Sequence, residues 1–291
     1  MLARGGRWVR LPGLLFHFAI DLVPLVYSAW LSLYDWWLLR PRSIPFVGLG
    51  NYARLATDPE VRRAVVVTGM FTAGSVAVEF LAGLALALLF SQQFRFLRPL
   101  RVLLLLPLFV VPVVGATMWR IIFHPDIGPL NYYLNLAGLG RPAWLSDPTL
   151  ALVSITLVDS WRTIPFMFLV MYAGIEMLPA ELFEAASVDG ASRWQAFRHI
   201  TVPLLTYIML VAVLIRGMDA FRELDIIYVL TGGGPGTATQ VIQMLSYRVF
   251  GLGHMGLANS LGMVTLALVA LGCYVLMRII LRPQRQARAA P

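Results

Sequence analysis

The chain has 291 residues, of which 59% are hydrophobic and 13% are charged. A soluble domain of this length needs far more charge to cover its surface, and the apolar residues here come in long blocks, so the sequence predicts a membrane protein. The net charge of +8 comes from arginines spread over short segments between the apolar blocks. This distribution favours contact with anionic membrane lipid and argues against a nucleic-acid partner.

A membrane-spanning helix needs about 20 mostly apolar residues, and several segments of the chain meet this requirement. The first follows a basic stretch, as in a signal peptide, but it is longer than the apolar core of one and lacks a small-residue cleavage site, so we interpret it as an uncleaved span. The predicted fold class is an all-α polytopic membrane protein of about six transmembrane helices in one domain, residues 1–291. The predicted spans are 12–34, 65–90, 102–123, 149–175, 204–229 and 257–281.

Arginine density distinguishes the two sides of the membrane. If the N-terminus lies inside, the four inner segments hold eleven arginines in 60 residues, and the three outer loops hold seven in 82. Because positive residues concentrate in cytoplasmic segments, both termini are predicted to lie in the cytoplasm. The inner segments are then 1–11, 91–101, 176–203 and 282–291.

The third inner segment is long and has the pattern of two short helices. Pro179 suits the first turn of a helix, and Asp189-Gly190 should end that helix with Gly190 in the left-handed conformation. Ser192, with Gln195 three residues later, has the pattern of a capping box for a second helix. An amphipathic helix lying on the lipid surface is the alternative. Because such a helix needs no turn at Gly190, a folded helix-turn-helix protrusion is favoured.

The same segment carries the motif Glu184-Ala185-Ala186, then Gly190, then Ile200-x-Val202-Pro203. It resembles the coupling-loop motif of permeases in binding-protein-dependent ABC importers, with Val202 in place of Leu as the only departure. The resemblance implies that this loop inserts into a cleft on a separate ATPase, that Glu184 makes a polar contact there, and that Gly190 permits the turn. The implied ATPase-coupling residues are Glu184, Ala185, Ala186, Asp189, Gly190, Ile200 and Pro203.

Two outer segments, 46–52 and 228–235, are similar to those of carbohydrate permeases of the maltose, trehalose and glycerol-phosphate type. The resemblance covers nearly the whole chain and implies a sugar or oligosaccharide substrate and a prokaryotic inner-membrane location. It also implies three kinds of partner: a second homologous permease, two ATP-binding cassette ATPase subunits and an extracytoplasmic solute-binding protein. The chain has no G-x-x-x-x-G-K-[ST] phosphate loop, so it is expected to be a transport subunit and not an enzyme. ATP and Mg²⁺ are expected on the ATPase subunits, with no cofactor, catalytic residue or metal site on this chain.

Charged residues also occur inside predicted spans, where each costs about 2.5–3.5 kcal/mol on insertion scales and normally faces a cavity or a partner. Asp159 and Arg162 are three residues apart, so they share a helix face and can pair. Glu79 is interpreted as structural. The charges form either structural ion-pair clusters or a polar translocation cavity, and the resemblance favours the cavity. By position it implies a substrate-binding set of Asp159, Arg162, Thr163, Phe166, Phe221, Arg222 and Asp225.

Several of these residues are charged where the maltose-type permease has amides or apolar groups. An anionic solute such as glycerol phosphate is therefore an alternative, which Arg162 and Arg222 favour. From a different class, an ion-coupled secondary transporter is a further alternative, with Asp159 or Asp225 as a proton or sodium site. The coupling loop discriminates between the classes, because an ion-coupled carrier has no use for an ATPase docking loop.

Overall fold

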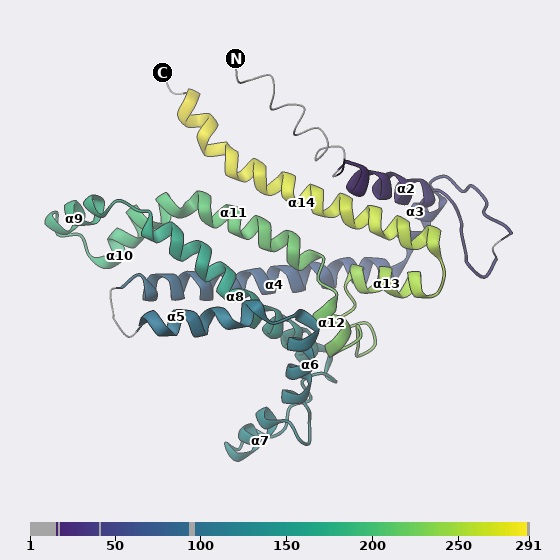
Figure 1. Ribbon diagram of the computed structural model, residues 1–291, viewed down its shortest axis with the longest axis horizontal. Coiled ribbons are helices and arrows are strands. Elements are labelled where there is room, and N and C mark those ends of the chain that lie inside the picture. Colours follow the sequence, from purple (N-terminus) through teal and green to yellow (C-terminus); the bar gives the residue numbers. More distant parts are fainter. Residues whose placement is uncertain (1–15, 17, 41, 93–96, 290–291) are drawn as a thin grey trace. The chain divides into compact units, whose positions relative to one another are not determined.

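The computed structural model describes residues 16, 18–40, 42–92 and 97–289, and its elements are helices joined by turns (Figure 1). Within these residues, four helices are long and apolar enough to cross a membrane, and a sharply bent pair makes a fifth. The predicted all-α polytopic membrane fold is thereby confirmed. Contacts within the chain group it into two compact units, unit 1 (Met1–Val65 with Ile242–Leu268) and unit 2 (Val66–Val241 with Val269–Pro291). The single transmembrane domain stays a prediction.

Unit 1 contains the described part of the first predicted span. A π-helical turn, η1 (Phe18–Leu22), leads into α2 (Val23–Leu31), and together they form a short apolar helix. The start of the predicted span and the arginines before it lie outside the described residues. The other helices of this unit are α3 (Gly50–Thr57), α13 (Ile242–Gly251) and the first part of α14 (Met255–Ala289).

Small polar side chains join α2, α3 and α14 in unit 1. The Ser28 hydroxyl donates to Asn259 Oδ1 at 2.5 Å, and the Ser260 hydroxyl donates to the Ser32 carbonyl oxygen at 3.0 Å. The same carbonyl oxygen accepts from the buried Asn51 amide at 2.8 Å. Asn51 belongs to the outer segment 46–52, so part of that sequence pattern serves to fix α3 against the end of α2.

Unit 2 carries most of the long helices. α4 begins in unit 1 and ends in unit 2, and π-helical turn η3 joins α10 to α11. Figure 1 shows α9 and α10 at one end of α8 and α11, and α6 and α12 at the other. The helices are α4 (Pro59–Phe90), α5 (Leu97–Leu105), η2 (Leu106–Phe109), α6 (Pro112–Ile122), α7 (Pro129–Leu136), α8 (Pro148–Glu176), α9 (Ala180–Val188), α10 (Arg193–Ala196), η3 (Phe197–Thr201), α11 (Val202–Phe221) and α12 (Asp225–Leu230).

The third predicted span, 102–123, is not one straight helix. Its two halves, Pro99–Phe109 and Pro112–Ile122, meet at an angle of 100°. Proline lacks a backbone N–H and disfavours helical geometry in the residue before it, and Val111 is accordingly extended, with ψ 133°. The break therefore follows from Pro112, a local signal that hydropathy over a long window averages away.

The fifth predicted span, 204–229, also ends early. α11 stops at Phe221, and α12 starts only at Asp225. The backbone N–H of Ile226 donates to Glu223 Oε1 at 3.1 Å, which satisfies one of the free donors at the start of α12. The charged stretch 222–225 thus lies at a break between two helices, where prediction had placed it inside a span.

Candidate functional site

The centre of the site is an ionic cluster around Arg216 of α11. Its guanidinium group donates to both carboxylate oxygens of Glu79 on α4, at 2.6 and 3.0 Å. It also donates to Asp159 on α8 and, at 3.1 Å, to Asp219 one turn further along α11. Arg216 is only 2% exposed, and the Glu79 and Asp159 side chains are fully buried. One guanidinium group therefore links three helices of unit 2.

Arg162 extends the cluster toward the end of α11. Its Nη2 atom lies 3.5 Å from Asp159 Oδ1 and 3.5 Å from Glu223 Oε2. The Arg162 side chain is 15% exposed and that of Glu223 is 9% exposed, so both are largely buried. The predicted pairing of Asp159 with Arg162 is confirmed. The ion pairs thus run from the buried Arg216 to the break between α11 and α12.

The seven predicted substrate residues occupy two neighbouring stretches of unit 2. Asp159, Arg162 and Thr163 are joined on α8, where the Thr163 hydroxyl donates to the Asp159 carbonyl oxygen at 2.7 Å. Phe166 follows them on α8 and is half-buried. The others lie at the break after α11, with Phe221 half-buried and Arg222 and Asp225 exposed. Arg222 donates to the Met218 carbonyl oxygen at 3.3 Å, so it has no part in the ion pairs around Arg216.

Glu79, Arg216, Asp219 and Glu223 were absent from the predicted site, although they make most of its ion pairs. Arg216 and Glu79 are 137 residues apart in sequence, and no spacing rule connects two such residues on different spans. The available signal was the accumulation of charge in the fifth predicted span, because such charges need partners on other helices. Glu79, an acid inside the second predicted span, had been interpreted as structural.

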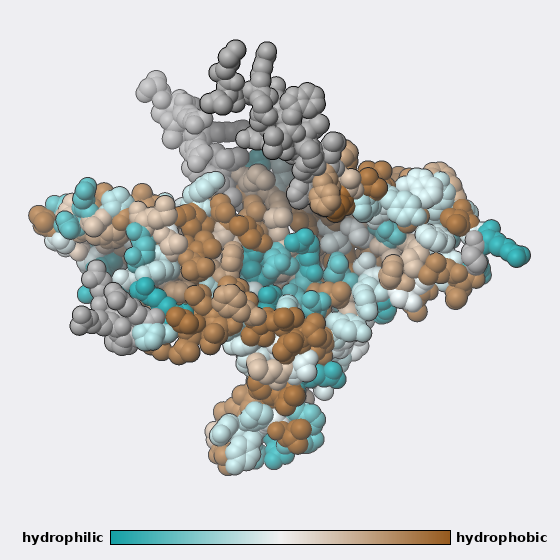
Figure 2. Space-filling model, in the orientation of Figure 1, coloured by the Kyte–Doolittle hydropathy of each residue, from teal (hydrophilic) through white to brown (hydrophobic). Residues whose placement is uncertain are grey.

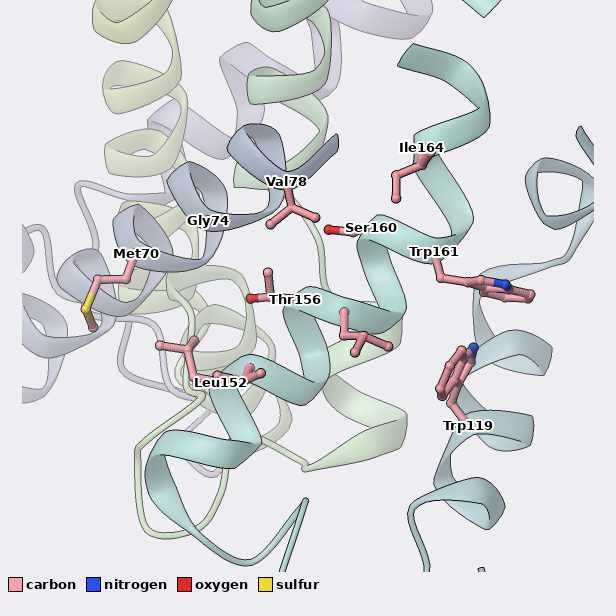
Figure 3. A pocket seen from close by; sticks show the side chains of 11 residues that line it. Met70, Gly74, Val78, Trp119, Leu152, Thr156, Ser160, Trp161 and Ile164 are labelled. Atoms are coloured by element: carbon pink, nitrogen blue, oxygen red, sulfur yellow. The ribbon is translucent and has the colours of Figure 1, made fainter. Parts of the chain in front are cut away.

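A cavity of about 600 Å³ lies beside the cluster between α4, α6 and α8. Figure 3 shows the Thr156 and Ser160 hydroxyls on α8, with the rings of Trp119 and Trp161 on the far side of that helix. The other lining side chains are apolar, among them Met70 and Val78 of α4. All seven predicted substrate residues are described, and none of them lines this cavity. Its apolar lining suits hydrocarbon better than a polar solute.

The surface around the cluster is not uniformly apolar. Figure 2 shows hydrophobic side chains over much of unit 2 and a hydrophilic patch near the C-terminal end of α11. Asp219, whose side chain is 56% exposed, belongs to this end of the helix, as do the exposed residues Arg222 and Asp225. Charged groups at the end of α11 are therefore exposed on the surface of this chain, and Asp219 connects them to Arg216.

The turn predicted within 176–203 is present, but the helix after it is continuous, from Arg193 to Phe221, with the fifth predicted span. α9 ends at Val188, and Gly190 has the left-handed φ of 75° that favours glycine. The capping box is formed, since the Ser192 hydroxyl accepts from the Gln195 N–H at 3.3 Å and the Gln195 side chain accepts from the Ser192 N–H at 2.7 Å. A second detail differs from the prediction: Pro179 precedes the first turn of α9 as its N-cap residue.

Apolar and charged side chains of this segment face outward. Val188 is 87% exposed and Trp194 is 66% exposed, although both are large and apolar. Within the predicted coupling set, Ala186 and Ile200 are half-buried, and the exposed members are Glu184, Ala185, Asp189, Gly190 and Pro203. The predicted coupling segment therefore presents both apolar and charged side chains on the surface of this chain.

The amino-acid sequence matches the family described as "Binding-protein-dependent transport system inner membrane component" over residues 79–286. The chain belongs to this family. It is therefore a membrane-embedded permease component of a transport system that depends on a binding protein, and a transport subunit rather than an enzyme, as the sequence predicted. This membership also excludes the ion-coupled secondary transporter. Both the ionic cluster and the helix-turn-helix lie within the matched range.

Named relatives agree with this assignment. The chain is 36% identical over 267 residues to the trehalose/maltose transport system permease protein MalF of Thermococcus litoralis, covering 92% of this chain and 90% of the relative. It is 34% identical over 270 residues to the trehalose transport system permease protein SugA of Mycobacterium tuberculosis, covering 92% and 86%.

A solved structure has the same fold. The crystal structure of a bacterial ABC transporter involved in the import of the acidic polysaccharide alginate matches with a TM-score of 0.77 at 23% identity, covering 98% of this chain and 95% of that one. A second match is the alginate transporter in complex with an alginate pentasaccharide-bound periplasmic protein, with a TM-score of 0.78 at 22% identity. At this identity the likeness concerns the fold alone.

Proposed function

We propose that this permease imports a neutral sugar or short oligosaccharide and forms half of the translocation pathway, together with a second homologous permease. The observation that carries the proposal is the polar, largely buried arrangement of Asp159, Arg162 and Glu223, which opens toward exposed charged groups at the end of α11. Carboxylate and guanidinium groups hydrogen-bond sugar hydroxyls, and the rings of Phe166 and Phe221 offer apolar faces to sugar CH groups. The trehalose and maltose permeases among its relatives support this solute class.

The charge of the cluster favours a neutral solute over the anionic alternative. Four carboxyl groups, those of Glu79, Asp159, Asp219 and Glu223, face only two guanidinium groups, those of Arg162 and Arg216. Both guanidinium groups are engaged by carboxylates. A solute phosphate or carboxylate would have to compete with these carboxylates for Arg162 and Arg216, which opposes binding, although Arg222 is exposed and lies outside these ion pairs.

The coupling residues give the proposal its mechanism. Glu184 and the exposed apolar groups Val188 and Trp194 would dock on a nucleotide-binding ATPase subunit, which holds ATP and Mg²⁺. Closure of two such ATPases on ATP would draw the loops of the two permeases together and open the solute cavity outward. A solute-binding protein on the outer side would then release its sugar into the cavity. Both termini of this chain lie in the cytoplasm in this scheme, as the arginine distribution predicts.

The function is tested by purifying the complex through this chain with its partner permease, ATPase subunits and binding protein, and measuring its ATPase rate in lipid. The panel contains trehalose, maltose, maltotriose, a polyol and glycerol 3-phosphate. Stimulation by the neutral sugars is expected. Stimulation by glycerol 3-phosphate alone would replace the neutral solute with an anionic one, and failure of any ATPase to co-purify would contradict the coupling scheme.

A second prediction concerns the docking surface. Because Glu184 is exposed in the middle of α9, Glu184→Lys is expected to reverse its charge without disturbing the fold of this chain. Sugar uptake is expected to be abolished, while sugar binding by the isolated binding protein stays unchanged. The control is Glu181→Lys on the same helix, also exposed and outside the predicted coupling set. Normal uptake by the Glu184 variant would contradict the role in coupling.

A further inference from the structure

Arg216 joins three helices of unit 2 through one side chain. Its guanidinium group binds Glu79 of α4 at both carboxylate oxygens and Asp159 of α8 at one. A guanidinium group presents its donors in a rigid planar fork, so a carboxylate held at both oxygens fixes the plane of that fork. A single residue thereby fixes the relative position of α4, α8 and α11 at the level of Arg216.

Stability alone does not account for this arrangement. Replacing a buried ion pair by apolar groups of similar volume is often neutral or stabilising. In a membrane-spanning segment, the free-energy cost of placing each charge in the bilayer adds to the cost of burying the ion pair. Three buried charges on three helices therefore indicate a requirement for fixed geometry, such as a defined position of neighbouring functional groups.

The neighbouring groups are those of the proposed solute site. Arg216 occupies Oδ2 of Asp159, which leaves Oδ1 toward Arg162. Arg162 in turn lies at equal distance from Asp159 and Glu223, 3.5 Å from each. Without Arg216, Asp159 loses the ion pair at Oδ2, and Arg162 is expected to lose the orientation that carries it to Glu223.

Two of the three helices that meet at Arg216, α8 and α11, lead to the predicted coupling segment, residues 176–203. α8 carries Asp159 and ends at Glu176, and three residues separate it from the start of α9. Beyond the turn, the helical path continues from Arg193 to Phe221 and carries Arg216 about 35 Å from its start, at 1.5 Å per residue. α8 and α11 therefore connect the coupling segment at one of their ends to the ionic cluster further along them (Figure 1).

A second close contact joins the same two helices near the coupling segment. Gly174 of α8 lies so close to α11 that an added Cβ would be 2.9 Å from Leu205 and 3.0 Å from Ile208. α8 and α11 are thus packed tightly at one end and ion-paired toward the other. The two helices are therefore held together at two separate points.

We propose that Arg216 is a positioning residue, which orients Asp159, Arg162 and Glu223 beside the solute and makes α8 and α11 move together with the coupling segment. The proposal rests on the proposed function. Arg216 itself is nearly fully buried and acts through its neighbours, without contacting the solute. Its loss is expected to separate ATP hydrolysis from sugar movement.

The test uses the complete transporter in liposomes, with radiolabelled trehalose and maltose as probes. The double variant Glu79→Gln/Arg216→Gln keeps side chains that hydrogen-bond each other and leaves the Asp159–Arg162 pair in place, so that it can assemble. Sugar taken up per ATP hydrolysed is expected to fall about tenfold or more, the effect of losing a hydrogen bond to a charged group. The matched control is Arg248→Gln, which removes an exposed ion pair with Glu60 and is expected to leave this ratio unchanged.

A second readout needs no solute. Spin labels at Leu169→Cys on α8 and Tyr207→Cys on α11, both exposed positions, report the distance between the helices in a Cys273→Ser background. The distance distribution is expected to be narrow and unchanged by ATP in the wild type, and broad in the double variant. If the double variant has the wild-type ratio of sugar uptake to ATP hydrolysis, or the wild-type distance distribution, the proposal is overturned. If the wild-type complex transports neither sugar, the proposed function is wrong, and the spin-label comparison alone decides the role of Arg216.

Discussion

The buried contacts between helices differ in chemistry from one unit of this permease to the other. In unit 1, α2 and α14 meet through neutral groups, with Ser28 donating to Asn259 and Ser260 donating to a backbone carbonyl. In unit 2, α4, α8 and α11 meet through the buried guanidinium group of Arg216 and its carboxylate partners. Both arrangements join helices that are far apart in sequence, but only the second uses charge.

The two kinds of contact differ in what they cost inside a membrane. Small hydroxyl and amide side chains let membrane helices approach closely, and each such hydrogen bond adds on average about 0.6 kcal/mol. Buried charges are costly in the same setting and are usually associated with a solute or ion pathway. The ionic contacts of unit 2 therefore carry a cost that the neutral contacts of unit 1 do not, and the proposed function gives a reason for that cost.

The largest effect is expected from removing one partner of the ionic cluster. Glu79→Leu leaves Arg216 buried with its main partner missing, and breaking a buried ion pair in this way costs about 3–5 kcal/mol of stability. Thermal denaturation of the purified complex measures the loss. Glu79→Leu/Arg216→Leu removes both charges and is expected to recover most of the stability, although not transport. If the double variant is as unstable as the single one, the loss comes from packing and not from an unpaired charge.

Local patterns in the sequence predicted local structure well. The capping box of Ser192 and Gln195, the turn at Gly190 and the pairing of Asp159 with Arg162 all depend on spacing along one short stretch of chain. Six apolar segments were also sufficient to predict a polytopic helical protein. In each case neighbouring residues determine the geometry, so the pattern is visible without knowledge of how helices pack.

The partners of Arg216 could not be predicted in this way. Glu79 and Asp159 lie on other helices, and their meeting with Arg216 depends on the rotation and depth of three spans. The sequence shows that these charges need partners but not which ones. The break after Phe221 was missed for a similar reason, because an apolar count over 204–229 tolerates the charged residues that end the helix.

An intermediate effect is expected at the closest approach in unit 1. Gly256 of α14 lies against the backbone of Tyr34, and an added Cβ would collide with the Tyr34 carbonyl oxygen. Because this oxygen belongs to the backbone, it cannot move aside as the end of a flexible side chain could. Gly256→Ala is therefore expected to destabilise the complex by about 1–3 kcal/mol, as other overpacking changes do. Gly262→Ala is the control, since a Cβ at this position on the same helix meets nothing within 4 Å. Equal melting temperatures for the two variants would show that the helices separate easily.

The smallest effect is expected for the neutral hydrogen bond between Ser28 and Asn259. Asn259→Ala removes the acceptor of the Ser28 hydroxyl, and the expected loss is about 0.6 kcal/mol, the average for side-chain hydrogen bonds between membrane helices. Thermal denaturation measures it, and sugar uptake per ATP is expected to stay at the wild-type value. A loss of coupling in this variant, without the instability seen for Glu79→Leu, would place part of the transport mechanism in unit 1. Wild-type coupling would instead restrict the mechanism to the helices that Arg216 joins, because a weak neutral contact can be lost without moving α8 or α11.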